Sequence, residues 1–182
     1  MEKQSMQDLG RLTVEAFKSA EKTPVILLLD NIRSGLNVGS VFRTADAFAL
    51  DKLILCGITA QPPHREILKT ALGSTDSVNW LFYEQAIDAV KALKQSNWSV
   101  WAVEQTTGST FLHDFEPQPG HRYAFILGNE VHGVDEALLP LCDGAIEIPQ
   151  FGTKHSLNVA VAAGIVAWEV AQKMRLPPSN IK

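Results

Sequence analysis

The stretch PVILLLDNIRSGLNVGSVFRTADAF, residues 24–48, changes character at its middle. Its first part, Val25–Leu29, is apolar at every position, which is typical of a parallel strand buried on both faces. Polar residues follow at once, and Asn37 is a good N-cap for a helix that continues to about Phe48. A second apolar run, Lys52–Gly57, completes a strand, a helix and a strand within roughly 30 residues. The stretch therefore predicts a βαβ unit with polar side chains after its first strand.

Alternating helices and strands continue through the rest of the chain. Apolar residues at helical spacing over 6–20 predict a helix before the first strand. The alternation predicts an α/β fold, a mostly parallel sheet sandwiched by helices, with its ligand site at the carboxyl ends of the strands. The elements expected after Gly57 are a short helix ending at Gly73, a strand at 78–82, a helix at 84–95, strands at 98–104 and 122–128, a helix at 135–141, a strand at 144–149 and a helix at 156–174 that Pro177 and Pro178 stop.

Composition and length describe an ordinary globular chain. The 182 residues are 46% hydrophobic and 20% charged, which is typical of about one domain with a buried core. The longest apolar run is far shorter than the roughly 18 residues of a membrane helix, and no leader pattern is visible, so we expect a cytoplasmic protein without a membrane partner. The net charge of −4 argues mildly against a general nucleic-acid coat protein, but leaves room for a local basic site.

The cysteines and histidines give no sign of a metal or disulfide framework. Cys56 and Cys142 lie far apart in apolar surroundings, which is typical of reduced core thiols. None of the five histidines stands at a metal-ligand spacing, so no metal site is expected.

The polar cluster after the first strand has two interpretations. Gly35 and Gly39 would let backbone N–H groups approach an anion, and a helix beginning at Asn37 would direct its positive end toward a phosphate. Arg43 lies on the following turns and could reach back to the same mouth. The simpler interpretation is a capped helix with a surface arginine. The presence of Arg33 in the same loop favours phosphate or nucleotide contact.

Two further polar clusters follow later strands. Glu130 comes two residues after a strand-ending glycine, where a carboxylate can also simply cap the next helix. Ser156 and Asn158 open the last helix, which is apolar on nearly every face. Ser156 could be only an N-cap, but an asparagine in the first turn of a buried helix needs a hydrogen-bonding partner. Such an apolar helix suggests a subunit interface, with full burial in one core as the alternative.

Familiar nucleotide and hydrolase fingerprints are absent from the sequence. There is no G-x-G-x-x-G after the first strand, no P-loop and no G-x-S-x-G nucleophile elbow. The three polar clusters therefore need a common explanation.

The three clusters occur in order as NIRSGLNVGSVFRTADAF at 31–48, FILGNEVHGVD at 125–135 and IEIPQFGTKHSLNVAVAAG at 146–164. In this order and spacing they resemble the motifs of the SpoU family of RNA ribose 2′-O-methyltransferases, within the knotted SPOUT superfamily. The resemblance spans about residues 24–172. The third stretch departs from the family at Gln150, where methionine is usual, and in a longer FGTKH segment, which bears on the shape of the expected cofactor loop.

The resemblance implies one SPOUT methyltransferase domain over residues 1–182 with a deep C-terminal trefoil knot. Residues 1–23 would be an N-terminal helical extension and residues 24–176 the catalytic core. The implied cofactor is S-adenosyl-L-methionine. The residues that the resemblance places around it are Thr106, Leu127, Gly128, Ile148 and Leu157.

The resemblance also implies a homodimer through the C-terminal helix, in which Arg43 of one subunit faces the cofactor of the other. Arg43 would be the main catalytic residue, surrounded by Asn37, Glu130, Ser156 and Asn158. A guanidinium stays protonated in proteins, so we expect Arg43 to hold the RNA phosphate and stabilise negative charge on the 2′-oxygen. Arg33 is a second candidate RNA contact.

The expected reaction is methyl transfer to a ribose 2′-hydroxyl of RNA. We expect tRNA rather than rRNA, because few residues precede the first strand to form an added RNA-binding domain. A non-catalytic module that binds RNA or an adenosine ligand on the same fold is the alternative. A dimer could gather a local basic groove from the N-terminal half of the chain, with Arg11, Lys18, Lys22, Arg33, Arg43, Arg65 and Lys69 as its candidate members.

Overall fold

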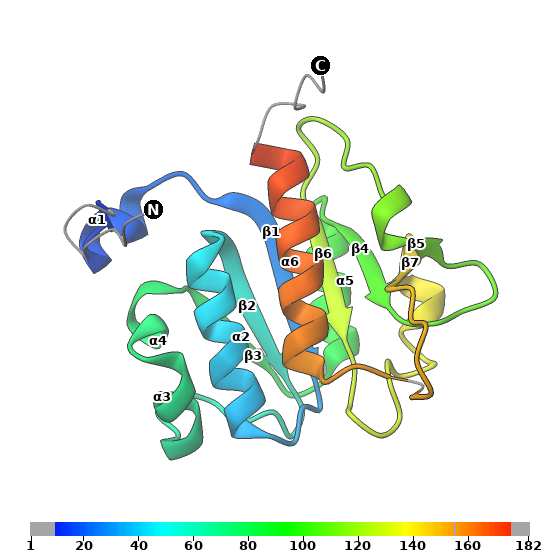
Figure 1. The fold of residues 1–182 in the computed structure, drawn as a ribbon, viewed down its shortest axis with the longest axis horizontal. Coiled ribbons are helices and arrows are strands. Elements are labelled where there is room, and N and C mark those ends of the chain that lie inside the picture. Colours follow the sequence, from blue (N-terminus) through cyan, green and yellow to red (C-terminus); the bar gives the residue numbers. More distant parts are fainter. Residues whose placement is uncertain (1–9, 155, 176–182) are drawn as a thin grey trace.

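The computed structural model describes residues 10–154 and 156–175, and this part of the chain forms a seven-stranded, wholly parallel sheet between helices. The strand order is β3-β2-β1-β6-β4-β7-β5. Figure 1 shows α2 and α6 side by side on one face of this sheet. The elements are α1 (Val14–Ser19), β1 (Thr23–Asp30), α2 (Gly35–Ala47), β2 (Leu50–Cys56), α3 (Arg65–Ala71), α4 (Ser74–Ser77), β3 (Trp80–Tyr83), α5 (Ala86–Gln95), β4 (Ser99–Val103), β5 (Thr110–Phe111), β6 (Tyr123–Leu127), β7 (Gly144–Glu147) and α6 (Val159–Arg175).

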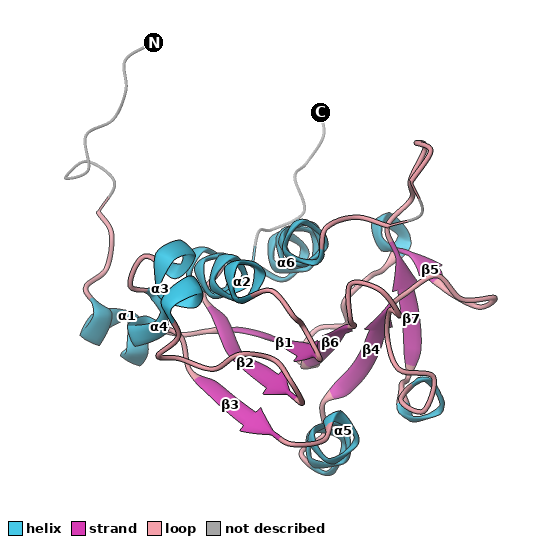
Figure 2. Cartoon of the chain, turned by 90° about the horizontal axis from the view of Figure 1, so that it is seen from below, coloured by secondary structure: helices cyan, strands magenta, loops and turns pink. Residues whose placement is uncertain are grey.

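The sheet separates two hydrophobic layers because alternate side chains of a strand point to opposite faces. Val25, Leu27 and Leu29 of β1 pack with α2 and α6, whereas Ile26 and Leu28 pack with α5 on the other face. Figure 2 shows this division, with α5 on the opposite side of the sheet from α2 and α6. All five side chains are fully buried, and each contributes about 1.5–3 kcal/mol by the usual transfer scale.

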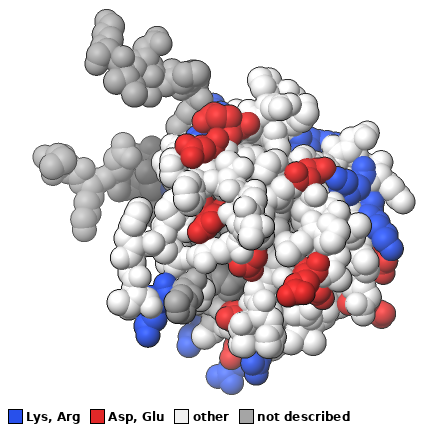
Figure 3. Space-filling model, turned by 90° about the vertical axis from the view of Figure 1, so that its right-hand side faces the viewer, with Lys and Arg blue, Asp and Glu red and all other residues white. Residues whose placement is uncertain are grey.

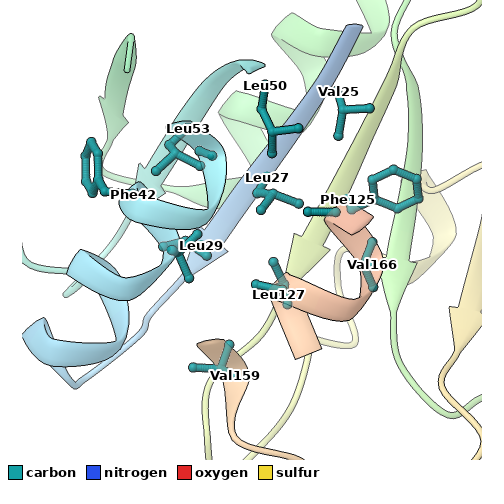
Figure 4. Close-up of a cluster of buried hydrophobic side chains, with 14 of the residues drawn as sticks. Val25, Leu27, Leu29, Phe42, Leu50, Leu53, Phe125, Leu127, Val159 and Val166 are labelled. Atoms are coloured by element: carbon teal, nitrogen blue, oxygen red, sulfur yellow. The ribbon is translucent and has the colours of Figure 1, made fainter. Parts of the chain in front are cut away.

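The α2 and α6 helices meet the sheet through side chains of very different size. Figure 4 shows Phe42 of α2 with Val159 and Val166 of α6 in the same buried cluster as Phe125 and Leu127 of β6. This cluster is the larger of the two hydrophobic layers. The two helices that cover it, α2 and α6, begin at the first and third polar clusters of the sequence.

The α/β class and the mostly parallel sheet are confirmed, and several element boundaries differ from the sequence predictions. The helix expected over 6–20 covers only Val14–Ser19 in the described part, because the Thr13 hydroxyl caps it by accepting the Ala16 N–H at 3.2 Å. Residues 6–9 lie outside the described residues, as do Pro177 and Pro178. The short helix expected to end at Gly73 corresponds to α3, and the four-residue helix α4, which begins directly after Gly73, was not predicted.

The helix expected over 135–141 was a wrong prediction. A turn occupies most of this segment, followed by a 3₁₀ turn at Leu139–Leu141. The Asp135 carboxylate accepts the N–H of Ala137 at 2.9 Å, which competes with helical bonding, and Pro140 has no N–H to donate. The trefoil knot stays a prediction that rests on the resemblance.

Both cysteines are free thiols. Burial raises the pKa of Cys56 to about 12 and that of Cys142 to about 11, and nearby aspartates act in the same direction. No described helix is long and apolar enough to cross a bilayer.

Candidate active site

A cavity of about 490 Å³ opens at the carboxyl ends of β4, β6 and β7. This is the edge of the sheet at which parallel α/β folds bind their ligands. The cavity brings together the five residues predicted to hold a cofactor and two of the predicted catalytic residues. These seven lining residues are Thr106, Leu127, Gly128, Ile148, Leu157, Glu130 and Ser156.

The turn after β6 forms one wall of the cavity, and it requires two glycines. A Cβ on Gly128 would stand 2.1 Å from the backbone of Gly133, and Gly133 itself has a φ of +71°. Asn129 closes the turn, because its side-chain oxygen accepts the N–H groups of Val131 at 2.9 Å and His132 at 3.3 Å. The side chain of Glu130 is thereby held at the mouth of the cavity.

Glu104 fixes the far end of the same turn, a role that was not predicted for it from the sequence. One carboxylate oxygen accepts the N–H of Val134 at 3.0 Å, and the other accepts the N–H of Gln105 at 2.9 Å. Its position directly after β4 was the available signal. The partner Val134 lies 30 residues further along the chain, so no local pattern reveals the contact.

A chain of hydrogen bonds joins the three polar clusters at this mouth. The Asn37 amide donates to Glu130 at 3.2 Å, and the Asn158 amide donates to the side-chain oxygen of Asn37 at 3.2 Å. The second carboxylate oxygen of Glu130 accepts the backbone N–H of Arg33 at 3.2 Å. The structure therefore brings Asn37, Glu130 and Asn158 into one polar network.

The same hydrogen bonds favour the ionised form of Glu130. Partial burial opposes ionisation, but N–H groups of Glu130 itself, Arg33 and Ser34 and the amide of Asn37 outweigh it. Together they hold the pKa of Glu130 below its usual value. Glu130 is thus an anchoring carboxylate that accepts hydrogen bonds at the start of α2.

The helix predicted to begin at Asn37 begins earlier. Ser34 is the N-cap of α2, since its hydroxyl accepts the N–H of Asn37 at 3.3 Å. Serine and asparagine are similarly good caps, so the sequence offers two candidates three residues apart. The earlier start places Asn37 in the first turn of the helix, with its side chain free to reach Glu130.

The glycines of α2 also have a different role from the one expected. A Cβ on Gly39 would lie 2.2 Å from the Thr70 hydroxyl and 2.3 Å from the carbonyl oxygen of Ile67, both in α3. A Cβ on Gly35 would meet Glu66 of α3 at 2.9 Å. Both glycines therefore face a packed helix rather than an anion, and they let α2 and α3 approach closely.

The last helix begins at Val159, not at Ser156. Asn158 caps it, because its side-chain oxygen accepts the N–H groups of Ala160 at 2.9 Å and Val161 at 3.4 Å. The hydrogen-bonding partner that Asn158 was expected to need is thus provided by its own helix and by Asn37. Ser156 precedes the helix and lines the cavity.

Arg43 does not reach this mouth within one chain. It is exposed and lines a separate groove between α2, α3 and α6, so the expectation that it reaches back beside Asn37 is wrong for the single chain. The reason is geometric, since six residues along α2 carry it well over one turn away from Asn37. Arg33 is exposed in the loop before α2, next to the mouth.

The described residues contain no group of three or more His, Cys, Asp or Glu side chains that could hold a metal ion. The polar atoms of the site are amides, hydroxyls, backbone groups, carboxylates and the imidazole of His132. They are suited to binding and orienting an organic ligand.

Comparisons with known proteins agree with the arrangement of the clusters. The SpoU rRNA Methylase family model matches residues 24–168. An uncharacterized tRNA/rRNA methyltransferase of Borreliella burgdorferi is 29% identical over 90% of this chain and 70% of its own length. The 23S rRNA (guanosine(2553)-2′-O)-methyltransferase RlmP of Bacillus subtilis is 33% identical over 80% of this chain and 57% of its own.

Among solved structures, an AdoMet-bound rRNA methyltransferase from Sinorhizobium meliloti superimposes with a TM-score of 0.78. The two chains are 27% identical, and the superposition includes 86% of this chain and 59% of the Sinorhizobium meliloti chain. The chain thus spans only part of these relatives, between 57% and 70% of their lengths. Because the family model matches most of the chain and includes all three polar clusters, the protein belongs to the SpoU methylase family.

Proposed function

We propose that the protein is an S-adenosylmethionine-dependent RNA methyltransferase that modifies a ribose 2′-hydroxyl. The observation that carries this proposal is the junction of a ligand-sized cavity with the hydrogen-bonded chain of Glu130, Asn37 and Asn158. A cavity alone would suit many ligands. A polar network at its mouth provides the fixed donors and acceptors that a transfer reaction needs.

The residues that line the cavity fit the proposed cofactor. Its volume of about 490 Å³ lies in the usual range for a small-molecule site. Leu127, Ile148 and Leu157 offer apolar surface for a planar base, and the turn at Gly128 brings backbone groups close to it. When bound, S-adenosylmethionine supplies an activated methyl group. The chain then has to orient and polarise the acceptor.

The polar network supplies the orientation. Glu130 fixes the Asn37 amide, and Asn37 fixes the Asn158 amide, so neither asparagine is free to rotate away from the mouth. Ser156 contributes a hydroxyl on the same rim. We assign these four side chains to holding the target ribose in line with the transferred methyl, where most of the acceleration arises from orientation.

Arg43 supplies the positive charge in this proposal, from a second copy of the chain. A guanidinium keeps its proton, so its role is to stabilise developing negative charge on the 2′-oxygen and to hold a neighbouring phosphate. The outer side of α6 carries exposed Val161, Ile165 and Trp168, and Gly164 of the same side lines the groove that contains Arg43. A second copy packed on this apolar face would lie directly beside Arg43.

The class of RNA remains part of the test. The expectation of tRNA rested on the small number of residues before β1, whereas the relatives include enzymes named for 23S rRNA. We therefore propose a structured RNA, with Arg33 and Arg43 as its contacts.

The experiment is transfer of labelled methyl from S-adenosylmethionine to RNA from a strain that lacks this gene, separated into tRNA and rRNA. Alkaline hydrolysis follows, because a methylated 2′-oxygen cannot attack the neighbouring phosphate and leaves an uncleaved dinucleotide. We expect label in one RNA fraction, within such dinucleotides, and none with Arg43→Ala. Label in mononucleotides would place the methyl on a base and contradict the ribose assignment.

The binding-module alternative gives a different pattern. S-adenosylhomocysteine would still raise the melting temperature, because a ligand that binds only the folded state stabilises it, but no RNA fraction would be labelled. Stabilisation by NAD instead would contradict the proposed cofactor.

A further inference from the structure

A second cavity, of about 560 Å³, lies between α2, α3 and α6 and is separate from the proposed cofactor site. Arg43 of α2 and Lys69 of α3 line it, together with three hydroxyl side chains. The complete lining is Ser40, Arg43, Thr44, Ala47, Phe48, Lys69, Thr70, Leu72 and Gly164. The hydroxyls of Ser40 and Thr70 both donate to the carbonyl of Leu36, so the guanidinium of Arg43 and the ammonium of Lys69 are the donors that the groove offers to phosphate oxygens.

The close packing of α2 and α3 brings the two cations to the same groove. Gly39 has no side chain, so Thr70 fits against α2 and its hydroxyl donates to the carbonyl of Leu36 at 2.9 Å. Lys69 directly precedes Thr70 on α3, the helix that this contact holds against α2. The packing of α3 on α2 therefore places Lys69 and Arg43 on the same groove.

Both cations are available for a ligand. In residues 10–154 and 156–175, neither Arg43 nor Lys69 takes part in an ion pair, and both are exposed. Other lysines have partners, since Lys94 pairs with Asp143 and Lys173 pairs with Glu169 at 3.2 Å. Lys22, one of the basic residues expected in a groove, instead donates to the carbonyl of Phe17.

The groove is a local positive site on a chain of net charge −4. Figure 3 shows scattered acidic side chains on the face at the β5–β7 end of the sheet, with lysines and arginines mainly toward its edges. Acidic side chains repel a polyanion, whereas Arg43 and Lys69, which take part in no ion pair within the described residues, attract it. The charge pattern thus favours a phosphate-bearing ligand in the groove.

We propose that the groove between α2, α3 and α6 binds the sugar–phosphate backbone of the RNA, and that Lys69 contacts a phosphate adjacent to the nucleotide that Arg43 faces. This inference rests on the proposed function and extends the RNA path onto α3. The substrate strand would then run along the α2–α3 junction, with Arg43 next to the reacting ribose and Lys69 one backbone step away.

The test compares Lys69→Ala with Lys91→Ala in RNA binding, measured at several salt concentrations with a labelled fragment of the RNA fraction that accepts methyl. Lys91 is also an exposed lysine, but lies on α5 across the sheet, so it matches the change in net charge. We expect Lys69→Ala to weaken binding about three- to tenfold and to reduce the slope of log affinity against log salt by about one. Lys69→Arg should retain the affinity, and S-adenosylhomocysteine binding should not change.

Equal effects of the two alanine variants would overturn the proposal. So would a change of sedimentation rate in Lys69→Ala without a loss of RNA affinity, because the groove would then hold a second copy of the chain. The two proposals can fail separately. If the wild-type protein binds RNA without transferring methyl, the proposed enzymatic function is wrong, and total RNA serves as the binding probe. A loss of RNA affinity in Lys69→Ala but not in Lys91→Ala would then still support RNA binding in the groove.

Discussion

The helices α2 and α6 lie on the same face of the sheet and begin beside the same cavity, yet their outer sides differ. The outer side of α2 is covered by α3, which approaches closely at Gly35 and Gly39. The outer side of α6 leaves Val161 and Trp168 about half exposed, at 51% each. The chain therefore completes the packing of one helix itself and leaves the other open. We interpret the open helix as the surface for a second copy.

The two helices also use glycine differently. Gly39 of α2 is in contact with another helix, whereas a Cβ on Gly164 of α6 would meet nothing within 4 Å. A glycine inside a helix weakens it unless close packing requires it. The contrast predicts opposite effects of the same substitution, and it indicates that Gly164 has no packing role within one chain.

The largest effect should follow from Arg43→Ala, the one exposed arginine on the covered helix. Removing its charge should lower methyl transfer by about 10²–10³-fold, as for loss of one transition-state donor, with cofactor affinity nearly unchanged. Single-turnover transfer and calorimetric binding of S-adenosylhomocysteine measure the two quantities. Loss of cofactor binding would contradict the assigned role.

If Arg43 acts across a dimer, two inactive variants should complement each other. Mixing Arg43→Ala with Asn158→Ala, after unfolding and refolding together, leaves one complete site in each mixed dimer and should restore about a quarter of wild-type activity. Mixtures of separately refolded dimers serve as the control. No recovery in the co-refolded sample would place Arg43 and Asn158 in the same chain's site.

The next effect concerns the two glycines. Gly39→Ala should lower the free energy of unfolding by about 2–3 kcal/mol, because the new methyl group overlaps the backbone of α3. Gly164→Ala should raise it by about 0.5–1 kcal/mol, since alanine is the better helix former and space is free. Urea unfolding measures both. A stabilising Gly39→Ala would show that α3 does not press on α2.

A smaller effect is expected at the open face of α6. Ile165 is 37% exposed there, and Ile165→Asp should weaken self-association at least about tenfold by placing a charge in an apolar interface. The stability of the dissociated chain should hardly change. Sedimentation velocity across a concentration series tests this, with Leu81→Asp on β3 as a control of similar exposure. Equal responses of the two variants would remove α6 from the interface.

The smallest effect should be the pH dependence that Glu130 contributes. Its pKa is lower in the folded than in the unfolded state, so its contribution to stability is complete above the usual value of 4.5 and is lost as the pH falls through the folded value. The stability difference between wild type and Glu130→Gln should therefore shrink below about pH 4.5. A difference that grows toward acid would mean that the Glu130 pKa is raised.

The sheet could be predicted from the sequence because its central strands are apolar at nearly every position. Val25–Leu29 and the segment 122–128 both became buried parallel strands, as β1 and β6. The two-residue strand β5 (Thr110–Phe111) could not be predicted, because it is too short to show a period. The turn in place of a helix at 135–141 arises from a side-chain hydrogen bond that competes with the helical pattern.

At the site, position along the strands was informative and side-chain direction was not. The residues that follow β4, β6 and β7 line the cavity as their positions suggested. Whether Gly39 faces an anion or a helix depends on where α3 packs, which no local pattern encodes. Arg43 likewise lies well over one turn along α2 from Asn37, and the groove that it lines is formed by α3 and α6, whose packing no local pattern encodes.

The hydrogen bond between Asn37 and Asn158 joins residues separated by 121 positions. During synthesis on the ribosome, at about 5–20 residues per second, Asn37 therefore waits roughly 6 to 24 s for its partner to be made. A nascent chain with a folded sheet through β6 still has no complete polar network. The network that we assign to orienting the target ribose therefore forms only after Asn158 has been made, and a nascent chain that ends before this residue lacks it.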